Sequence, residues 1–141
     1  MGKTVLLPVD LAAPHTWQKP LAEALLMVQG GGVLHVATVL PDFGMSMVGA
    51  FFQQGFEQTA LHQIGQNLQG WVAQHVPGAV EVHPHVLHGK IYDEILRAAD
   101  KLSVDVIVMG SHRPEARDYL LGSNAARVVR HAPQSVYVTR D

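Results

Sequence analysis

Two short segments in the last third of the chain carry the residue types that bind a phosphate group. Residues 110–114 are Gly-Ser-His-Arg-Pro, and residues 120–125 are Leu-Leu-Gly-Ser-Asn-Ala, directly before a stretch with helical spacing. The first turn of a helix has free N–H groups and a partial positive charge, which stabilise an anion. Gly122 would let phosphate oxygens approach the backbone, Ser123 could cap the helix while donating its hydroxyl, and Asn124 could add an amide donor. We therefore expect an anion-binding site here.

Each segment has a plainer explanation when it is taken alone. Gly110 is equally typical of a tight turn after a strand, and Gly122-Ser123 of an ordinary helix start. Arg113 favours binding, because a guanidinium group can hold the same anion through two hydrogen bonds. Ser123 has no evident His and acid partner at a nucleophile elbow, so a hydrolase motif is not indicated.

A further set of candidates stands at the ends of apolar segments that are typical of buried strands. In an open parallel sheet, ligands collect beyond the carboxyl ends of the strands, where successive connections leave for opposite faces. If the first and fourth strands are neighbours at that point, the residues near the crevice are Pro8, Val9, Asp10, Val36, Met109 and Gly110. Asp10 contributes the only carboxylate of this set.

The hydrophobic pattern alternates between strands and helices along the whole chain. We expect strands at 4–9, 33–39, 80–87, 104–109 and 135–139, and helices at 14–29, 52–76, 91–99 and 123–131. Such an alternation implies parallel strands joined by right-handed crossovers. Residues 80–87 alternate apolar and polar side chains, which indicates an edge strand, and the apolar strand 135–139 is expected at the other edge.

Length and composition limit the classes of protein that fit. The chain has 141 residues, 48% of them hydrophobic, which suits one domain over 1–141. Its ten Lys and Arg residues are scattered and the formal net charge is −2, so nucleic-acid binding is not expected. No apolar run approaches the roughly 18 residues that cross a bilayer, so membrane insertion is not expected either. The absence of cysteine suits a cytoplasmic location, which we expect.

Nine histidines raise the alternative of a metal site. His83 and His85 share one strand face and His88 follows closely, but no acidic or cysteine residue stands at a spacing that completes a tetrahedral set. We therefore expect surface histidines there and no metal. His35 lies inside a buried-type strand and is expected to be a core imidazole hydrogen-bonded to backbone or to a neighbouring side chain.

One apolar group has three open interpretations. Met45, Met47, Phe51 and Phe52 could form a lid over a ligand, a docking surface for a partner, or part of the core.

The segments described above closely resemble the universal stress protein family, and most of all its F/G-type branch. The likeness rests on residues 110–114, 119–126 and 129–133, and it extends in order through residues 3–10, 34–36 and 105–111. It implies a three-layer α/β/α sandwich with a five-stranded parallel sheet in the order 3-2-1-4-5. This fold is the adenine nucleotide alpha hydrolase-like, Rossmann-like type.

The resemblance also implies a bound ATP, ADP or AMP, with or without Mg²⁺. Asp10 and Val36 would hold the base, while Pro8, Val9, Met109 and Gly110 would line the base and ribose. The residues expected to meet the phosphates are His112, Arg113, Gly122, Ser123, Asn124 and Ala125, and Gly89 completes the set.

The chain departs from the family's general glycine pattern at one place. Arg113 stands where a second glycine is expected, and the segment to Gly122 is one residue shorter. Arginine removes the close backbone approach that glycine allows, but it offers a guanidinium group that binds phosphate by a different geometry.

Three functions follow as hypotheses. The first is an ATP-binding regulator or sensor of the stress response. The alternatives are a slow ATP hydrolase or phosphoryl transferase, and an interaction module that needs no nucleotide. We also expect a homodimer through residues 135–139, or a higher assembly built from such dimers, together with protein partners that the sequence does not identify.

Overall fold

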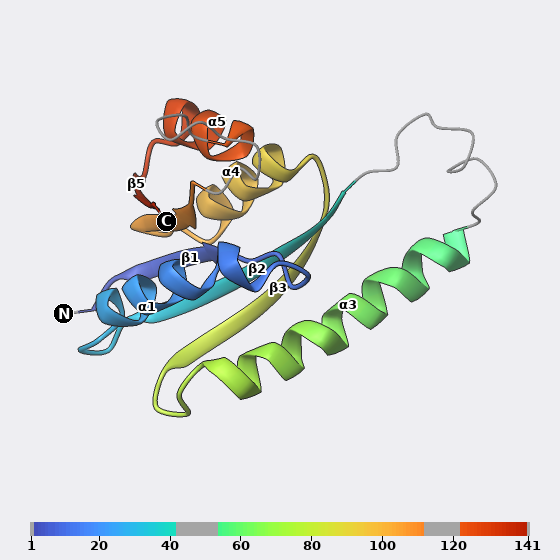
Figure 1. The fold of residues 1–141 in the computed structure, drawn as a ribbon, viewed down its shortest axis with the longest axis horizontal. Helices are drawn as coiled ribbons and strands as arrows, with labels where there is room; N and C mark the ends of the chain where they lie inside the picture. Colours follow the sequence, from blue (N-terminus) through green and yellow to red (C-terminus); the bar gives the residue numbers. More distant parts are fainter. Residues whose placement is uncertain (1, 42–53, 112–121, 141) are drawn as a thin grey trace.

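The computed structural model describes residues 2–41, 54–111 and 122–140, and within them it contains one parallel sheet. Its five strands lie in the order β3-β2-β1-β4-β5, which confirms the predicted order (Figure 1). The strands are β1 (Thr4–Pro8), β2 (Val33–Pro41), β3 (Glu81–Gly89), β4 (Val106–Gly110) and β5 (Ser135–Thr139). β3 and β5 form the two edges, as their sequence patterns indicated.

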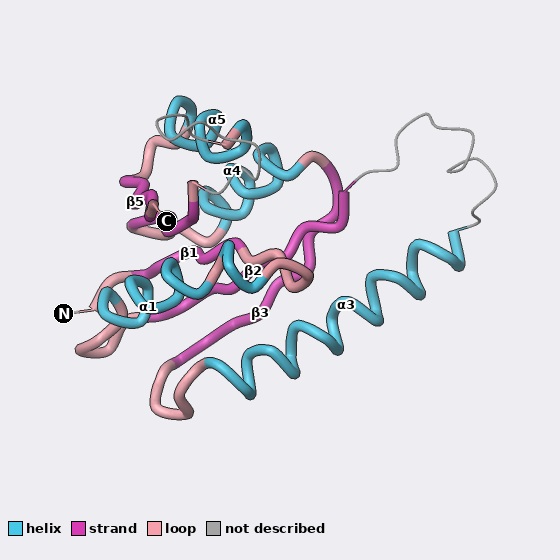
Figure 2. Tube along the Cα trace, in the orientation of Figure 1, coloured by secondary structure: helices cyan, strands magenta, loops and turns pink. Residues whose placement is uncertain are grey.

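Helices cover both faces of this sheet and complete the predicted three-layer sandwich. They are α1 (Gln18–Met27), α3 (Gln54–His75), α4 (Ile91–Lys101) and α5 (Ser123–His131), with a short 3₁₀ helix η1 (Pro14–Thr16) before α1. α1 and α3 lie on one side and α4 and α5 on the other (Figure 2). No helix in the described part of the chain is long and apolar enough to cross a membrane.

The central strand β1 separates two hydrophobic cores. Val5 and Leu7 are completely buried in the core beneath α1 and α3, and Leu6 is completely buried in the core beneath α4 and α5. Both faces of β1 are therefore apolar, as expected for a central parallel strand. The edge strand β3 instead alternates between exposed and half-buried residues at its start.

The first helix begins later than the sequence pattern indicated. We expected a helix from residue 14, whereas residues 14–16 form η1 and α1 begins at Gln18. Pro20 explains the shift, because a proline has no N–H and fits an α-helix only in its first turn. The interruption leaves Thr16 beside the carboxyl end of β1, where it becomes part of the site described next.

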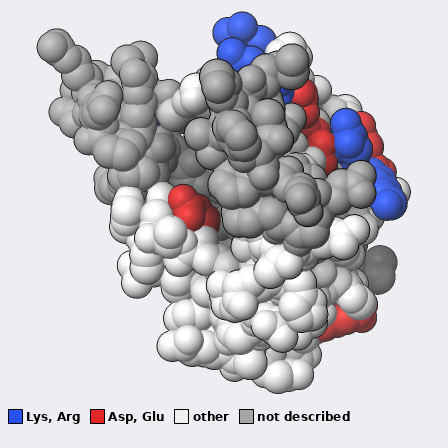
Figure 3. Space-filling view, turned by 90° about the vertical axis from the view of Figure 1, so that its right-hand side faces the viewer, with Lys and Arg blue, Asp and Glu red and all other residues white. Residues whose placement is uncertain are grey.

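Charges are unevenly distributed on the surface. On the face drawn in Figure 3, Lys and Arg side chains occur in separate places, and most of the lower area carries no charged side chain. Among the residues that the structure describes, this face shows no continuous basic stripe of the kind that tracks a nucleic-acid backbone.

Candidate functional site

A cavity of about 300 Å³ opens at the carboxyl ends of β1, β2 and β4. It lies where β1 is flanked by β2 on one side and β4 on the other, the switch point at which open parallel sheets bind ligands. The described residues that line it are Pro8, Val9, Asp10, Thr16, Ala37, Thr38, Val39, Ile91, Ile95, Met109, Gly110 and Asn124. Its volume is at the lower end of the range for small-molecule sites.

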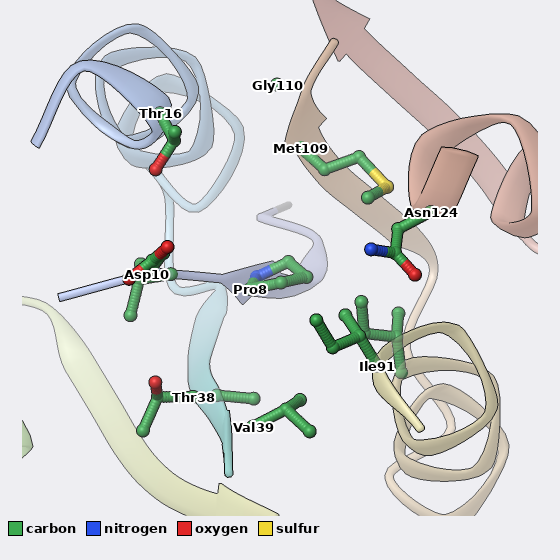
Figure 4. A pocket seen from close by; sticks show the side chains of 12 residues that line it. Pro8, Asp10, Thr16, Thr38, Val39, Ile91, Met109, Gly110 and Asn124 are labelled. Atoms are coloured by element: carbon green, nitrogen blue, oxygen red, sulfur yellow. The ribbon is translucent and has the colours of Figure 1, made fainter. Parts of the chain in front are cut away.

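The cavity has an apolar floor between two polar sides (Figure 4). Pro8 lies at the centre of the view, with Met109 and Ile91 toward one side. Asp10, Thr16 and Thr38 lie on the opposite side, and the Asn124 side chain points inward from the start of α5. A flat ring could rest on this floor while hydroxyl, amide and carboxylate groups bind its polar edges.

Asp10 is held in place by the turn that follows β1. Its Oδ1 accepts a hydrogen bond from the Ala12 N–H at 3.0 Å, and its carbonyl oxygen accepts one from the Ala13 N–H at 3.0 Å. The Thr16 hydroxyl in turn donates to the Ala13 carbonyl at 2.6 Å. The exposed carboxylate of Asp10 is therefore oriented at the cavity mouth by short-range bonds.

Gly110 allows the start of α1 to approach the end of β4. A Cβ atom at this position would lie 2.9 Å from the Thr16 carbonyl oxygen and 3.6 Å from Pro20 Cγ. A separation under 3.0 Å is not tolerated without movement of the backbone. Glycine is thus required here for close packing, which brings Thr16 to the cavity wall beside Gly110.

The start of α5 differs from the expectation in one respect. Gly122 is the N-cap residue, and Ser123 is the first helical residue, exposed and making no capping bond. The prediction that Ser123 caps this helix is therefore wrong. The Gly122 N–H donates to the Ser111 carbonyl at 3.3 Å, which ties the start of α5 to the end of β4. The first-turn N–H groups are not taken by a capping side chain in this part of the chain.

Six of the expected site residues line the cavity together: Pro8, Val9, Asp10, Met109, Gly110 and Asn124. Val36 does not line it, because its side chain is completely buried in the core beneath α1 and α3. Ala125 is likewise buried, in the core beneath α4 and α5. Gly89 is at φ 142° and packs against the Glu94 side chain, outside the described cavity lining.

Several expected positions lie outside the described residues. They are His112 and Arg113 of the expected phosphate site, and Met45, Met47, Phe51 and Phe52 of the apolar group.

The residues missed by sequence reasoning come mainly from β2 and α4. β2 continues to Pro41, so Ala37, Thr38 and Val39 reach the cavity where Val36 was expected. Ile91 and Ile95 belong to the first turns of α4, which begins at this edge of the sheet. The amphipathic spacing at 91–99 was visible, but it does not reveal which turn of the helix meets the ligand side.

Comparisons with known proteins agree on one family. The model of the universal stress protein family matches residues 1–140. Universal stress protein G of Escherichia coli O157:H7 is 34% identical over 142 aligned residues, which cover 99% of this chain and 100% of that protein. Universal stress protein G of Salmonella typhimurium is 33% identical over the same shares.

Solved structures show the same fold at lower sequence identity. The structure of the hypothetical protein MJ0577 superposes with a TM-score of 0.81 at 19% identity, covering 100% of this chain and 98% of that one. A universal stress protein crystallised in complex with cAMP gives a TM-score of 0.67 at 17% identity, covering 99% and 98%. At these identities the likeness concerns the fold alone.

Proposed function

Because this chain belongs to the universal stress protein family, we propose that it binds an adenine nucleotide, with ATP as the principal ligand, and acts as a nucleotide-dependent regulator of a stress response. One observation carries the proposal. Asn124, at the start of α5, is one of the residues that line the cavity at the carboxyl ends of β1 and β4. An apolar base site and a helix N-terminus suited to an anion therefore adjoin each other.

The lining residues fit the parts of a nucleotide. Pro8, Val39 and Met109 supply apolar surface for the base, and the carboxylate of Asp10 can accept hydrogen bonds from amino or hydroxyl groups. Asn124 and the first-turn N–H groups of α5 would receive the phosphates, together with Arg113 and His112. A related protein of the same fold was crystallised with cAMP, itself an adenine nucleotide.

We propose binding without robust hydrolysis. Asp10 is the only carboxylate among the described residues that line the cavity, and one of its oxygens already accepts the Ala12 N–H. Phosphoryl transfer needs a metal held beside the phosphates and a group that orients the nucleophile. When Mg²⁺ is present it would neutralise phosphate charge, held mainly by the phosphate oxygens and water.

The second element of the proposal is a homodimer through β5. This strand lies at an edge of the sheet, and Tyr137 on it is 42% exposed. An exposed edge strand presents unpaired backbone groups that a second copy can satisfy.

The phosphate site is tested by comparing ATP with adenosine in isothermal titration calorimetry. We expect Gly122→Asp to weaken ATP binding by at least about tenfold, because a carboxylate at the N-cap accepts first-turn N–H groups and repels phosphate. Adenosine binding should remain within about twofold, since adenosine has no phosphate. Equal loss of both ligands, or no loss of either, would contradict phosphate binding at the start of α5.

Hydrolysis is measured in the same preparation. Phosphate release is followed with ATP and Mg²⁺ while the nucleotide content of the protein is assayed. Retained, intact ATP supports a sensor. Steady multiple turnover would select the hydrolase, and failure to bind any adenine nucleotide would select the interaction module.

A further inference from the structure

A second group of titratable side chains lies on β2 and β3, on the sheet face that α4 and α5 cover elsewhere. We call it the imidazole cluster: His35, His83 and His85, with Glu81 beside them. His35 is paired with His83 in the register of the two strands, and Ala37 is paired with His85. Leu34 and Val36 on either side of His35 belong to the core on the opposite face, so the cluster faces away from that core.

The three rings are in direct contact. His35 Nδ1 and His85 Nε2 are 2.9 Å apart, within hydrogen-bond distance. The ring centroids of His35 and His83 are 5.3 Å apart and stacked, and those of His35 and His85 are 5.1 Å apart. His83 Nε2 lies 2.8 Å from Glu81 Oε2.

This arrangement revises the sequence-based expectations. His35 lies within hydrogen-bond distance of a neighbouring side chain, as predicted, but it is half-buried and not a core residue. That neighbour, His85, is one of the three histidines expected at the surface. Glu81 contacts His83, although we expected no acidic residue at a spacing that completes a tetrahedral set, and this contact alone does not complete one. His88 stands one residue out of phase with His83 and His85 along β3, so it faces the other side of the sheet.

The pKa values of two rings of the cluster are lowered, which favours their neutral form. Burial, followed by the nearby His85 and His83, lowers the pKa of His35 below its ordinary value of 6.5. Burial, followed by His83 and Lys101, lowers the pKa of His85. Neutral imidazoles keep a nitrogen lone pair, which metal binding requires.

The cluster is also accessible from solvent. The side chains of His83 and Glu81 are 50% and 61% exposed. The positive charge of Lys101, at the end of α4, disfavours the protonated form of His85. Glu81 supplies a negative charge on the other side of the cluster.

We propose that the imidazole cluster binds a divalent transition-metal ion that prefers square-planar or tetragonal coordination, Cu²⁺ or Ni²⁺. Imidazole and carboxylate donors suit these ions. At a metal–nitrogen distance of about 2.0 Å, two ligands at a right angle lie about 2.8 Å apart. His35 Nδ1 and His85 Nε2 are already 2.9 Å apart, which is the separation that two adjacent ligands need.

Binding requires one tautomer change and side-chain rotations, because the His35 and His85 rings must turn until both nitrogens face one ion. The hydrogen between the two nitrogens shifts to the other nitrogen of its own ring, with no net loss of a proton. In the arrangement described, no three His, Asp or Glu side chains of the described residues are placed around one ion. His83 is half-exposed and is paired with His35 in the register of the two strands. It rotates about its side-chain torsions to become the third ligand, and Glu81 either becomes a further ligand or balances the charge of the ion.

The test is a titration of the full chain with Cu²⁺, in the presence of glycine as a weak competitor, followed by electron paramagnetic resonance. We expect one tight equivalent whose spectrum shows coupling to imidazole nitrogens. His35→Gln and His85→Gln should each weaken it by at least about tenfold. His83→Gln, at an exposed position where folding is not at risk, should remove one nitrogen from the coupling pattern.

Matched controls are His62→Gln and His131→Gln, which replace exposed histidines on α3 and α5. Both should leave the tight equivalent unchanged. The proposal is overturned if the parent protein shows no equivalent that outcompetes glycine, or if the control variants lose as much affinity as His35→Gln and His85→Gln. ATP binding, measured on the same variants, reports separately on the cavity and on correct folding.

Discussion

Asp10 shows how one residue is prepared for a ligand by its neighbours in sequence. Its Oδ1 accepts the Ala12 N–H, and the turn through Ala13 brings the Thr16 hydroxyl to the same cavity. The orientation of the carboxylate is therefore fixed by local bonds. A ligand would meet an acceptor that needs little reorganisation, which preserves affinity.

The charge of Asp10 can be separated from its role in the turn. Asp10→Asn keeps an oxygen for the Ala12 N–H but removes the negative charge, whereas Asp10→Ala removes both. Since a hydrogen bond to a charged group contributes about 1.5–3 kcal/mol, we expect Asp10→Asn to weaken ATP binding by about tenfold or more. Its melting temperature should equal that of the parent. Calorimetry and thermal unfolding check both, and unchanged ATP affinity in both variants would exclude Asp10 from the site.

Gly110 should be indispensable for a steric reason. Gly110→Ala places a Cβ 2.9 Å from the Thr16 carbonyl oxygen, and overpacking of this kind costs about 1–3 kcal/mol. Gly78→Ala is the matched control, because a Cβ at Gly78 meets nothing within 4 Å. We expect the control to change stability by less than about 0.5 kcal/mol in urea unfolding. Equal stability of the two variants would show that the contact at Gly110 is not tight.

The predicted positions of single residues agree with the cavity lining where a strand end determines the position of a side chain, and ligand binding by these residues stays a prediction. Pro8, Asp10 and Met109 reach the cavity because β1 and β4 end there. Val36 was expected near the cavity but does not line it, because the residues of β2 that reach the cavity depend on how far the strand continues. An apolar run does not show where the pairing of β2 with β3 stops. The contact between Gly110 and Thr16 joins segments far apart in the chain, and no local pattern reveals it.

At the scale of the elements, alternation of hydrophobic residues was the dependable signal. The edge position of β3 was correct, and so were the bounds of α5 and β5. The late start of α1 could not be predicted in full from the position of Pro20, because Thr16 also packs closely against Gly110, which is distant in sequence. The pairing of His35 with His83 likewise depends on a register that periodicity alone leaves open.

The role of β5 in self-association can be tested with a charge at its exposed side chain. Tyr137→Lys should convert the dimer to a monomer in sedimentation equilibrium, because lysine on an edge strand opposes edge-to-edge pairing. Leu26→Lys, at a position on α1 that is 60% exposed, is the control and should leave the dimer intact. Dimers of equal stability in both variants would place the interface elsewhere, and a monomeric parent protein would exclude the dimer itself.

At the scale of the whole molecule, the sheet order and the two cores create the site. Leu6 and Val5 anchor opposite layers on one strand, so α1 and α4 approach the same carboxyl edge from opposite faces. The cavity lies between Thr16 of η1, which directly precedes α1, and the first turns of α4. The order of strands was expected from the family resemblance, whereas the alternation by itself indicated only parallel pairing. The same architecture places the imidazole cluster on β2 and β3, next to Ala37, which lines the cavity and is paired with His85.

The most direct test of nucleotide binding in this cavity is the methyl spectrum of the methionines during a titration with ATP. The chain has five Met residues, and of the two that lie within the described residues, Met109 lines the cavity while Met27 packs against the core beneath α1 and α3. We predict a saturable shift of the Met109 methyl signal, assigned by Met109→Leu, with the Met27 signal unchanged. A Met109 signal that does not respond to saturating ATP would contradict the account.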